Sequence, residues 1–458
     1  MTSTPFNTLP LPPALLDNLS AIGYHKMTEI QRQSLPLLLA GRDLIARAKT
    51  GSGKTAAFGI GLLLQLDPAR YSPQSLVLCP TRELATQVAQ ELRRLARFLP
   101  NIKILTLSGG TPIGPQIGSL EHGAHVIVGT PGRIRDHLRK QTLKLDHIRT
   151  LVLDEADRML DMGFRDEIRQ IAAETPAGRQ TLLFSATYPD EIQRLSGDFQ
   201  RDPAQVILEE APSPLQIQQC FFETDRDGQL GALHRLLLHY QPEAAVIFCN
   251  TKQSCNDVGD YLNGHGFSAL VLHGDLDQRD RDQVLVRFAN RSCPLLIATD
   301  VAARGLDIED LPCVINFELT RSADTHTHRI GRTGRAGREG LALNLVLPSE
   351  AHKVNAIADQ LQLDPEFLAL PAESVDQRPA PAPMATLAIN GGRKNKIRPG
   401  DILGALTGDA GIAGNQVGKI DVFDFVTYVA VQRSEASKAQ DRLQKGTIKG
   451  RKFRVRKL

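Results

Sequence analysis

Short runs of consecutive apolar residues recur along the first 350 residues, and polar, Gly or Pro residues end each run abruptly. Longer stretches between the runs, such as 83–98 and 253–262, carry apolar residues at helical spacing. Strands that are apolar throughout and alternate with amphipathic helices predict parallel sheets covered by helices on both faces. The predicted strands are 44–46, 76–79, 126–128, 151–153, 182–184, 246–249, 270–272, 295–298, 314–315 and 341–346.

This alternation occurs twice, which predicts an α/β domain over residues 1–207 and a second one over 208–370. Residues 371–383 are rich in Pro and Ala and poor in pattern, as is typical of an extended linker. Residues 384–458 form a small α+β domain in the order βαββαβ, the arrangement of RNA recognition motifs. Its predicted elements are strand 386–389, helix 398–406, strands 417–422 and 425–431, helix 435–443 and strand 452–456.

Charge is distributed unevenly between these parts. The whole chain has a net charge of +3, whereas residues 384–458 hold 15 Lys and Arg against 6 Asp and Glu, a net of +9. The first 383 residues therefore carry a net of −6. This asymmetry predicts a basic domain that meets a polyanion, and the alternative is a basic tail that only improves solubility.

Other features of the composition narrow the class of protein. The six cysteines form no CxxC pair, and no basic segment followed by an apolar one opens the chain. No apolar run reaches the length of a membrane span. We therefore expect a reduced, cytoplasmic protein without a zinc site, a disulfide framework or a membrane segment.

A Gly-rich segment follows the first predicted strand and opens a helix. Backbone N–H groups of such a turn can hold phosphates, and Lys54 would reach the β- and γ-phosphates of a nucleotide while Thr55 binds Mg²⁺. The first position is Ala48, where this motif usually has Gly, and the alternative is a coincidental Gly-rich turn. The predicted loop consists of Ala48, Lys49, Thr50, Gly51, Ser52, Gly53, Lys54 and Thr55.

Acidic residues end the predicted strand 151–153. Asp154 is placed where Mg²⁺ at a phosphate loop needs an oxygen ligand. Glu155 beside it could orient and deprotonate the attacking water. Acidic clusters usually belong to solvated surfaces, and the functional interpretation depends on the buried strand and the phosphate loop that precede this one.

Arginines in the second half could complete an ATPase site. Phosphoryl transfer needs cations at the γ-phosphate in the transition state, and Arg332 and Arg335 are spaced to project together from a turn. The alternative for this segment is a basic surface patch.

Together these segments resemble the DEAD-box RNA helicase family, and the resemblance covers about residues 6–350. It implies two RecA-like domains and an ATPase that separates RNA strands. Residues 23–31 resemble the segment that reads adenine, with Gln31 at the base edge, Phe6 as the upstream aromatic and Met27 where the family usually has Pro. The resemblance also implies a ribose contact for Asp307 and roles as arginine fingers for Arg332 and Arg335.

The same resemblance assigns RNA contacts and a coupling motif. Residues 185–187 (SAT) match the motif that couples hydrolysis to strand separation, through Ser185 and Thr187. Residue types of this kind hold phosphates and 2′-hydroxyls without reading bases, so the two-domain core should be blind to RNA sequence. The implied RNA-binding residues of the core are Thr81, Arg82, Gly110, Thr130, Arg133 and Thr299.

Residues 391–401 and 428–431 resemble the DEAD-box subfamily that is activated by 23S ribosomal RNA. This implies binding of a 23S hairpin near the peptidyl-transferase centre and action on pre-50S particles. Lys394, Lys396 and Tyr428 are the predicted RNA-binding residues of this domain, with Tyr428 stacking on a base. Phe423 and Phe425 are interpreted as core or strand-end residues, and the other interpretation of Tyr428 is a strand residue packed in the core.

Three alternatives stay open beside a monomeric ribosomal helicase that uses ATP and Mg²⁺ and does not act on DNA. The first is a general RNA helicase of cold adaptation or decay, for which an Arg/Gly-rich disordered tail would be typical. The second is an ATP-dependent RNA clamp without turnover, which the complete motifs disfavour. The third is a DNA translocase, which stimulation of ATP turnover by DNA would reveal.

Overall fold

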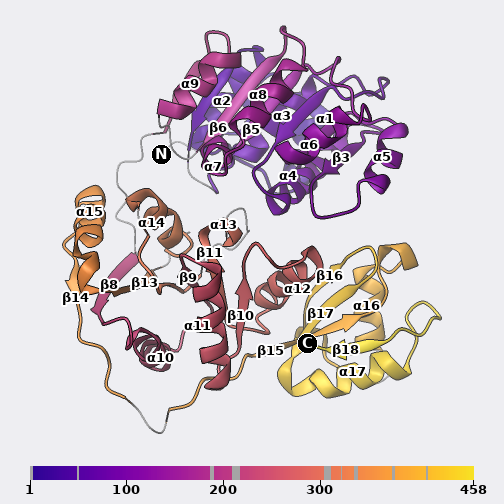
Figure 1. The fold of residues 1–458 in the computed structure, drawn as a ribbon. Helices are drawn as coiled ribbons and strands as arrows, with labels where there is room; N and C mark the ends of the chain where they lie inside the picture. The colour runs from indigo at the N-terminus through magenta and orange to yellow at the C-terminus, as the bar shows by residue number, and fades with distance from the viewer. Residues whose placement is uncertain are drawn as a thin grey trace. The chain divides into compact units, whose positions relative to one another are not determined.

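The structure, a computed structural model, describes residues 4–48, 51–185, 190–208, 217–303, 311–320, 322–334, 339–373, 377–408 and 411–458. Its contacts divide the chain into two compact units that meet in the sequence between residues 211 and 212. The first unit holds one parallel sheet, and the second holds a parallel sheet followed by a small antiparallel sheet (Figure 1). The predicted fold class, two parallel α/β domains and a small α+β domain, is confirmed.

The first sheet runs in the order β3-β4-β2-β5-β6-β1-β7, with all neighbours parallel. Successive residues of a strand face opposite sides, so Leu44 and Ala46 belong to one apolar cluster and Ile45 to another. Its strands are β1 (Leu44–Arg47), β2 (Ser75–Leu78), β3 (Ile104–Leu107), β4 (Val126–Gly129), β5 (Thr150–Asp154), β6 (Gln180–Ser185) and β7 (Ala204–Ile207).

Helices cover both faces of this sheet, as its apolar strands require. Apolar residues of α1 to α4 pack in one cluster, and those of α6 to α9 pack in the other. The helical elements are η1 (Phe6–Thr8), α1 (Pro13–Ala21), α2 (Glu29–Leu39), α3 (Lys54–Leu64), α4 (Arg82–Leu95), η2 (Ala96–Phe98), α5 (Gly114–Glu121), α6 (Pro131–Arg139), α7 (Ala156–Asp161), α8 (Arg165–Ala173) and α9 (Asp190–Phe199).

The second parallel sheet runs in the order β10-β11-β9-β12-β13-β8-β14. Apolar residues of α10 and α11 cover one face, and α15 contributes to a cluster on the other. The strands are β8 (Ile217–Glu223), β9 (Ala245–Cys249), β10 (Ala269–Leu272), β11 (Leu295–Thr299), β12 (Cys313–Asn316), β13 (Gly340–Val346) and β14 (Glu366–Phe367). The helical elements are α10 (Gln229–Tyr240), α11 (Lys252–Gly264), α12 (Gln278–Ala289), α13 (Asp300–Ala303), α14 (Ala323–Ile330), η3 (Pro348–Glu350) and α15 (Ala351–Leu361).

The C-terminal domain has an antiparallel sheet in the order β16-β17-β15-β18, with two helices packed on one face. The predicted order βαββαβ is therefore present. Its elements are β15 (Met384–Ile389), η4 (Arg393–Asn395), α16 (Pro399–Thr407), η5 (Gly414–Gln416), β16 (Val417–Val422), β17 (Thr427–Gln432), η6 (Arg433–Glu435), α17 (Ala436–Lys445) and β18 (Val455–Lys457).

The structure corrects the predicted strands in two respects. It adds β3, β7, β8 and β14, of which β3, β7 and β14 lie at sheet edges, where a strand needs no continuous apolar run. The third strand of the C-terminal domain begins at Thr427, so Phe425 lies in the turn before it and not in the strand predicted over 425–431.

Candidate nucleotide site and RNA-binding surfaces

The predicted phosphate loop leads from β1 into the eleven-residue helix α3. Gly53 precedes the helix with a φ of 94°, and a Cβ on it would lie 2.6 Å from Nε2 of Gln31, so this position requires glycine. Lys54 is the first residue of the helix, and its buried Nζ donates a hydrogen bond to the carbonyl oxygen of Ala48 at 2.5 Å. Gly51, Ser52 and Thr55 are placed with them, while Lys49 and Thr50 lie outside the described residues.

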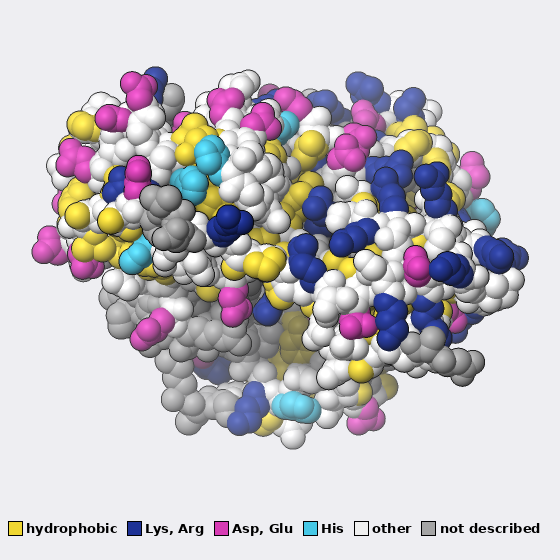
Figure 2. Space-filling view, turned by 90° about the horizontal axis from the view of Figure 1, so that it is seen from below, with side chains coloured by type: hydrophobic (Ala, Val, Ile, Leu, Met, Phe, Trp, Pro, Cys, Tyr) yellow, Lys and Arg dark blue, Asp and Glu magenta, His cyan; other side chains and the backbone are white. Residues whose placement is uncertain are grey.

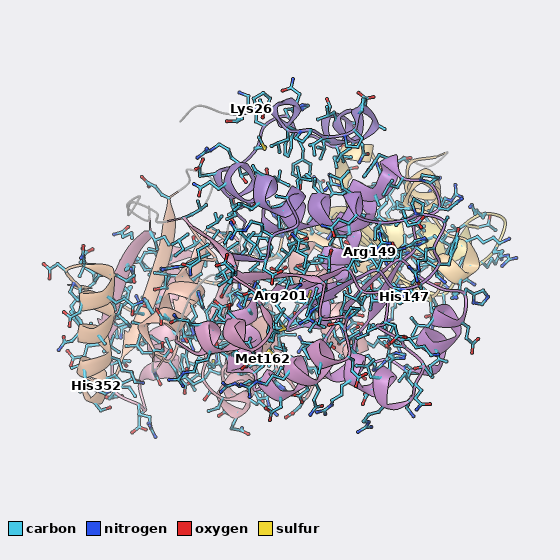
Figure 3. All side chains as sticks on the ribbon, turned by 90° about the horizontal axis from the view of Figure 1, so that it is seen from above. Lys26, His147, Arg149, Met162, Arg201 and His352 are labelled. Atoms are coloured by element: carbon cyan, nitrogen blue, oxygen red, sulfur yellow. The ribbon has the colours of Figure 1, made fainter. Side chains whose placement is uncertain are left out.

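Gln31 connects the start of α2 to this loop. Its Nε2 donates to the carbonyl oxygen of Gly53 at 3.1 Å, and its Oε1 accepts from the backbone N–H of Thr28 at 2.9 Å. Phe6 is buried and makes an edge-on contact with Tyr24, with 6.4 Å between ring centroids. Met27, three residues after Tyr24, is also buried. Lys26 is exposed at the rim of the first domain (Figure 3). The segment predicted to read adenine is therefore joined to the phosphate loop through Gln31.

Asp154 is the last residue of β5 and is buried beside the phosphate loop. Burial raises the pKa of its carboxyl from the ordinary 3.8 to about 7, while the Lys54 ammonium opposes this shift and Glu155 adds to it. A carboxyl whose burial disfavours its charged form is suited to a position where a cation binds. The structure therefore brings together the two residues, Lys54 and Asp154, that the sequence predicted for the phosphates and the metal.

Glu155 follows with a φ of 53°, which turns the chain sharply from β5 into α7. Its Oε2 accepts a hydrogen bond from Nη1 of Arg158 at 2.8 Å, and both side chains are buried. Arg158 was not predicted from the sequence, although its position three residues after Glu155 at a helix start is a spacing typical of such a pair. This ion pair holds the predicted base in one orientation.

Ser185, predicted to couple hydrolysis to strand separation, ends β6 between the strands that carry the loop and Asp154. Its carbonyl oxygen accepts from the backbone N–H of Ala48 at 3.0 Å. Its Oγ is buried and, within the described parts of the chain, has no hydrogen-bond partner. The hydroxyl is therefore available to a group beyond the described residues, whereas Thr187 lies outside them.

The RNA-binding residues predicted for the first domain come together at the carboxyl ends of three adjacent strands. Thr81 and Arg82 follow β2, Gly110 follows β3, and Thr130 with Arg133 follows β4. A Cβ on Gly110 would lie 2.0 Å from Nη1 of Arg82, so the arginine passes directly over the glycine backbone.

Hydrogen bonds fix these loops. Thr81 caps α4 by accepting from the backbone N–H of Leu84 at 3.2 Å, and Nη2 of Arg133 donates to the carbonyl oxygen of Thr111 at 2.8 Å. Nη1 of Arg133 is buried and unpartnered among the described atoms. This edge of the sheet thus presents ordered cationic and hydroxyl groups, the types that hold an RNA backbone.

In the second domain, Thr299 ends β11 and Asp300 begins α13. Asp300 accepts a two-pronged pair of bonds from Arg329, at 2.6 Å from Nε and 2.8 Å from Nη2. The guanidinium of Arg329 is 1% exposed and also donates to Asn250, Asn316 and the carbonyl oxygen of Glu318. Arg329 was given no role from the sequence, yet it joins the ends of several strands to α14.

Of the two predicted arginine fingers, Arg332 lies within the described residues. Arg332 lies in the turn after α14, where its side chain is buried and has partners. Arg335 and the predicted ribose contact Asp307 lie outside the described residues. Their roles at a γ-phosphate and a ribose stay predictions.

A hollow of about 660 Å³ lies at the opposite, amino-terminal edge of the first sheet. Arg149 and His147, which precede β5, are part of its lining and lie near one another in Figure 3. Its lining includes no residue predicted to bind nucleotide or RNA; those predicted for the first domain and placed by the structure lie at or near the carboxyl edge of the sheet.

The C-terminal domain displays its basic side chains. Lys394 in η4 and Lys396 directly after it are both exposed. Lys and Arg side chains gather over this domain, on the right of Figure 2, with few acidic side chains among them. These exposed basic side chains are thus accessible to a polyanion, as predicted for this domain.

The burial of Tyr428 argues against the prediction that this side chain stacks on a base. Its side chain is 1% exposed and packs with Ala388 of β15 and Val286 of α12. Phe423 covers it in an edge-on contact, with 5.6 Å between ring centroids. The sheet face that carries Tyr428 is therefore covered by the second parallel-sheet domain of the same unit.

Three families match the chain, in the order of its domains. "DEAD/DEAH box helicase" matches residues 28–195, "Helicase conserved C-terminal domain" 228–337 and "DbpA RNA binding domain" 386–457. Among the described residues, no helix is both long and apolar enough to cross a bilayer.

Relatives and solved structures agree with these matches. ATP-dependent RNA helicase DbpA of Escherichia coli is 56% identical over 456 residues, which cover 99% of this chain and 100% of that protein. ATP-dependent RNA helicase CshA of Listeria monocytogenes is 44% identical, covering 76% of this chain and 67% of that protein. The structure of Saccharomyces cerevisiae Dbp5 bound to RNA and ADP BeF3 matches with a TM-score of 0.73 and 31% identity, covering 80% of this chain and 96% of that one.

These matches agree with the phosphate loop, the buried Asp154 and the cationic and hydroxyl groups at the carboxyl edge of the first sheet described above. The chain therefore belongs to the DEAD-box family of ATP-dependent RNA helicases and carries a DbpA-type RNA-binding domain.

Proposed function

We propose that this helicase acts on 23S ribosomal RNA during assembly of the large ribosomal subunit and that its C-terminal domain selects the RNA. The observation that carries the proposal is the 56% identity to E. coli DbpA, which spans 99% of the chain and thus includes the C-terminal domain. The net charge of +9 on residues 384–458 supports binding of an RNA backbone there. The proposal includes a monomer that works in the cytoplasm, where pre-50S particles mature.

In the proposed ATPase site, each described residue has one task. Lys54 exchanges the carbonyl oxygen of Ala48 for the β- and γ-phosphates, because phosphate oxygens carry more negative charge. Asp154 and Thr55 would hold Mg²⁺, which neutralises charge on the phosphates when it is bound. Glu155, oriented by Arg158, positions water and accepts its proton.

The residues fit a nucleotide and its metal on structural grounds. Asp154 is a carboxyl buried at the end of β5, and burial disfavours its charged form, which a bound cation would favour. The start of α3 directs backbone N–H groups and partial positive charge toward the loop. Arg332 and Arg335 of the second domain are proposed to stabilise charge on the γ-phosphate, and Asp307 to contact the ribose.

RNA-stimulated ATP hydrolysis tests the proposal. The whole protein should turn over ATP fastest with a 23S fragment that contains the hairpin near the peptidyl-transferase centre. A hairpin of the same length and shuffled sequence should stimulate less, and a DNA copy should not stimulate. Equal stimulation by both RNA hairpins would favour the second candidate, a general RNA helicase, and stimulation by DNA would contradict both.

A further inference from the structure

Phe425 is the most exposed large apolar side chain in the described parts of the chain, at 71% of its surface. It lies between β16 and β17, in a turn closed by a hydrogen bond from the backbone N–H of Phe423 to the carbonyl oxygen of Val426 at 2.8 Å. Burial of a phenylalanine side chain is normally favourable, although a single exposed one is not unusual. The residues around Phe425 indicate that its exposure serves binding.

Two backbone hydrogen bonds fasten the basic turn η4 to this hairpin tip. The N–H of Arg393 donates to the carbonyl oxygen of Phe423 at 2.8 Å, and that of Lys394 donates to the carbonyl oxygen of Asp424 at 3.0 Å. A Cβ on Gly392 would lie 2.1 Å from the same oxygen of Phe423, so the two segments approach as closely as glycine allows. The two segments that carry the exposed ring and the exposed Arg393 and Lys394 side chains are therefore joined directly through their backbones.

The usual stacking face of such a domain is covered. Ala388 and Tyr428, which point away from the domain's own helices, pack against Val286 of α12. Thr386 on the same face shares a hydrogen bond of 2.7 Å with Ser292, which follows α12. RNA bases cannot reach this face while the domain is so packed, whereas the tip at Phe425 stays open.

The charges around the tip indicate what part of an RNA would lie on the ring. Asp424 is exposed next to Phe425 and would repel a phosphate placed over the tip. Arg393 and Lys394 attract phosphates a short distance along the same surface. An uncharged, planar group over the ring with its phosphate on the basic turn satisfies both conditions, and a base of single-stranded RNA is such a group.

We propose that Phe425 is the stacking platform on which the C-terminal domain holds one unpaired base of its RNA, with the adjacent phosphate on Arg393 and Lys394. The inference rests on the proposed function only for the choice of RNA. It replaces Tyr428, the aromatic residue favoured by the sequence, with a residue that the sequence assigned to the core or a strand end.

The test is binding of the 23S hairpin fragment to the full-length protein at fixed salt, measured by fluorescence anisotropy. Stacking of a base on an aromatic ring is worth roughly 1–3 kcal/mol, so Phe425→Ala should weaken binding roughly 5- to 150-fold. Phe425→Leu should weaken it similarly, because leucine is apolar but has no ring face. Phe425→Trp should bind within about twofold of the natural protein.

Two controls separate stacking from other effects. Leu403→Ala removes another exposed apolar side chain of the same domain, on α16, and should leave binding unchanged. Lys394→Gln should lower the slope of log Kd against log salt by about 0.7–0.9, while Phe425→Ala should keep that slope. Circular dichroism checks that each variant is folded.

The possible outcomes distinguish this inference from the proposed function. If the natural protein does not prefer the 23S fragment to a shuffled hairpin, the proposed target fails, and the same Phe425 series is then decided with the shuffled RNA. If the preference is present but Phe425→Ala binds as tightly as the natural protein, the platform is refuted. If Phe425→Ala is unfolded, equal binding by the Leu and Trp variants refutes it instead.

Discussion

At the scale of single residues, the proposed ATPase site contains three buried ionisable side chains. Lys54, Asp154 and Glu155 are all nearly inaccessible to solvent; Lys54 donates to the carbonyl oxygen of Ala48, and Glu155 is paired with Arg158. Charges in such surroundings interact more strongly than in water. Substitutions at these positions should therefore separate binding from hydrolysis.

Lys54→Ala should abolish ATP turnover because the phosphates lose their main cation. Glu155→Gln should bind ATP and RNA but hydrolyse ATP about 10²- to 10⁴-fold more slowly, because the proton acceptor is lost while Asp154 stays in place. Steady-state ATPase rates and fluorescent-nucleotide binding measure the two effects. Lys140→Ala and Glu174→Gln, two exposed positions of the same domain, serve as matched controls. Wild-type turnover in Glu155→Gln would contradict the assignment of the base.

His326 gives the second domain a pH dependence. Burial, followed by the nearby charge of Arg329, lowers the pKa of this imidazole from 6.5 to about 4. The unfolded chain takes up the proton near pH 6.5 and the folded chain only near pH 4. The unfolding free energy should therefore fall by about 1.4 kcal/mol per pH unit as the pH drops through this window, and His326 adds no slope above it.

Scanning calorimetry at pH 7 and pH 5 measures this slope. Between pH 7 and pH 5, the midpoint temperature for unfolding of the second domain should fall less in His326→Gln than in the natural protein. His352→Gln, at an exposed histidine of α15 (Figure 3), should behave as the natural protein does. An unchanged pH response in His326→Gln would show that other groups set it.

At the scale of elements, Arg329 holds the carboxyl ends of the second sheet together. Its guanidinium contacts Asn250 after β9, Asn316 at the end of β12 and Asp300 after β11. It also lies 5.1 Å from the ring centroid of Phe248. The elements that carry Thr299 and Arg332 are thus tied to one buried cation.

Arg329→Met should destabilise the second domain by about 3–5 kcal/mol, because Asp300 loses its partner. The stability of Arg329→Lys should lie between those of the natural protein and Arg329→Met, since lysine keeps the charge but cannot form the bidentate hydrogen bond to Asp300. Urea unfolding followed by circular dichroism measures both, with the exposed Arg226→Met as control. A loss below about 1 kcal/mol in Arg329→Met would mean that the remaining contacts suffice.

At the scale of the whole molecule, the connection to the C-terminal domain is held at both ends. Arg235 donates to the carbonyl oxygens of Leu370 and Pro371, on the side of the second domain. Arg433 donates to the carbonyl oxygens of Ala382 and Pro383, on the side of the C-terminal domain. The place to divide the chain is therefore between residues 377 and 380.

Cutting there should give an N-terminal piece that keeps RNA-stimulated ATPase activity but loses its preference for ribosomal RNA, because its contacts address the backbone. The C-terminal piece should bind the 23S fragment alone, with a salt slope of about 0.7–0.9 per phosphate neutralised. Circular dichroism checks folding of each piece, and anisotropy measures binding. A core piece that still chose the 23S fragment would end the model in which the tail selects the RNA.

Much of the site could be predicted from the sequence because its signals are local. The Gly-rich turn, the acidic pair after an apolar strand and the basic residues of the tail are each read within a few positions. The carboxyl ends of neighbouring parallel strands meet at one edge, so the pattern also predicted that these groups come together. Edge strands such as β3 and β14 were missed because they need only be partly buried.

The tertiary structure alone decided which aromatic side chain of the C-terminal domain is open to RNA. By its pattern Tyr428 is a strand residue facing away from the helices, and Phe425 is one of the apolar residues that end a strand. Residues of α12, more than a hundred positions earlier, cover the first ring, and a tight turn leaves the second in solvent. The sequence determines which face a side chain takes on its own strand, but exposure depends on what distant segment packs there, and a local pattern carries no record of that contact.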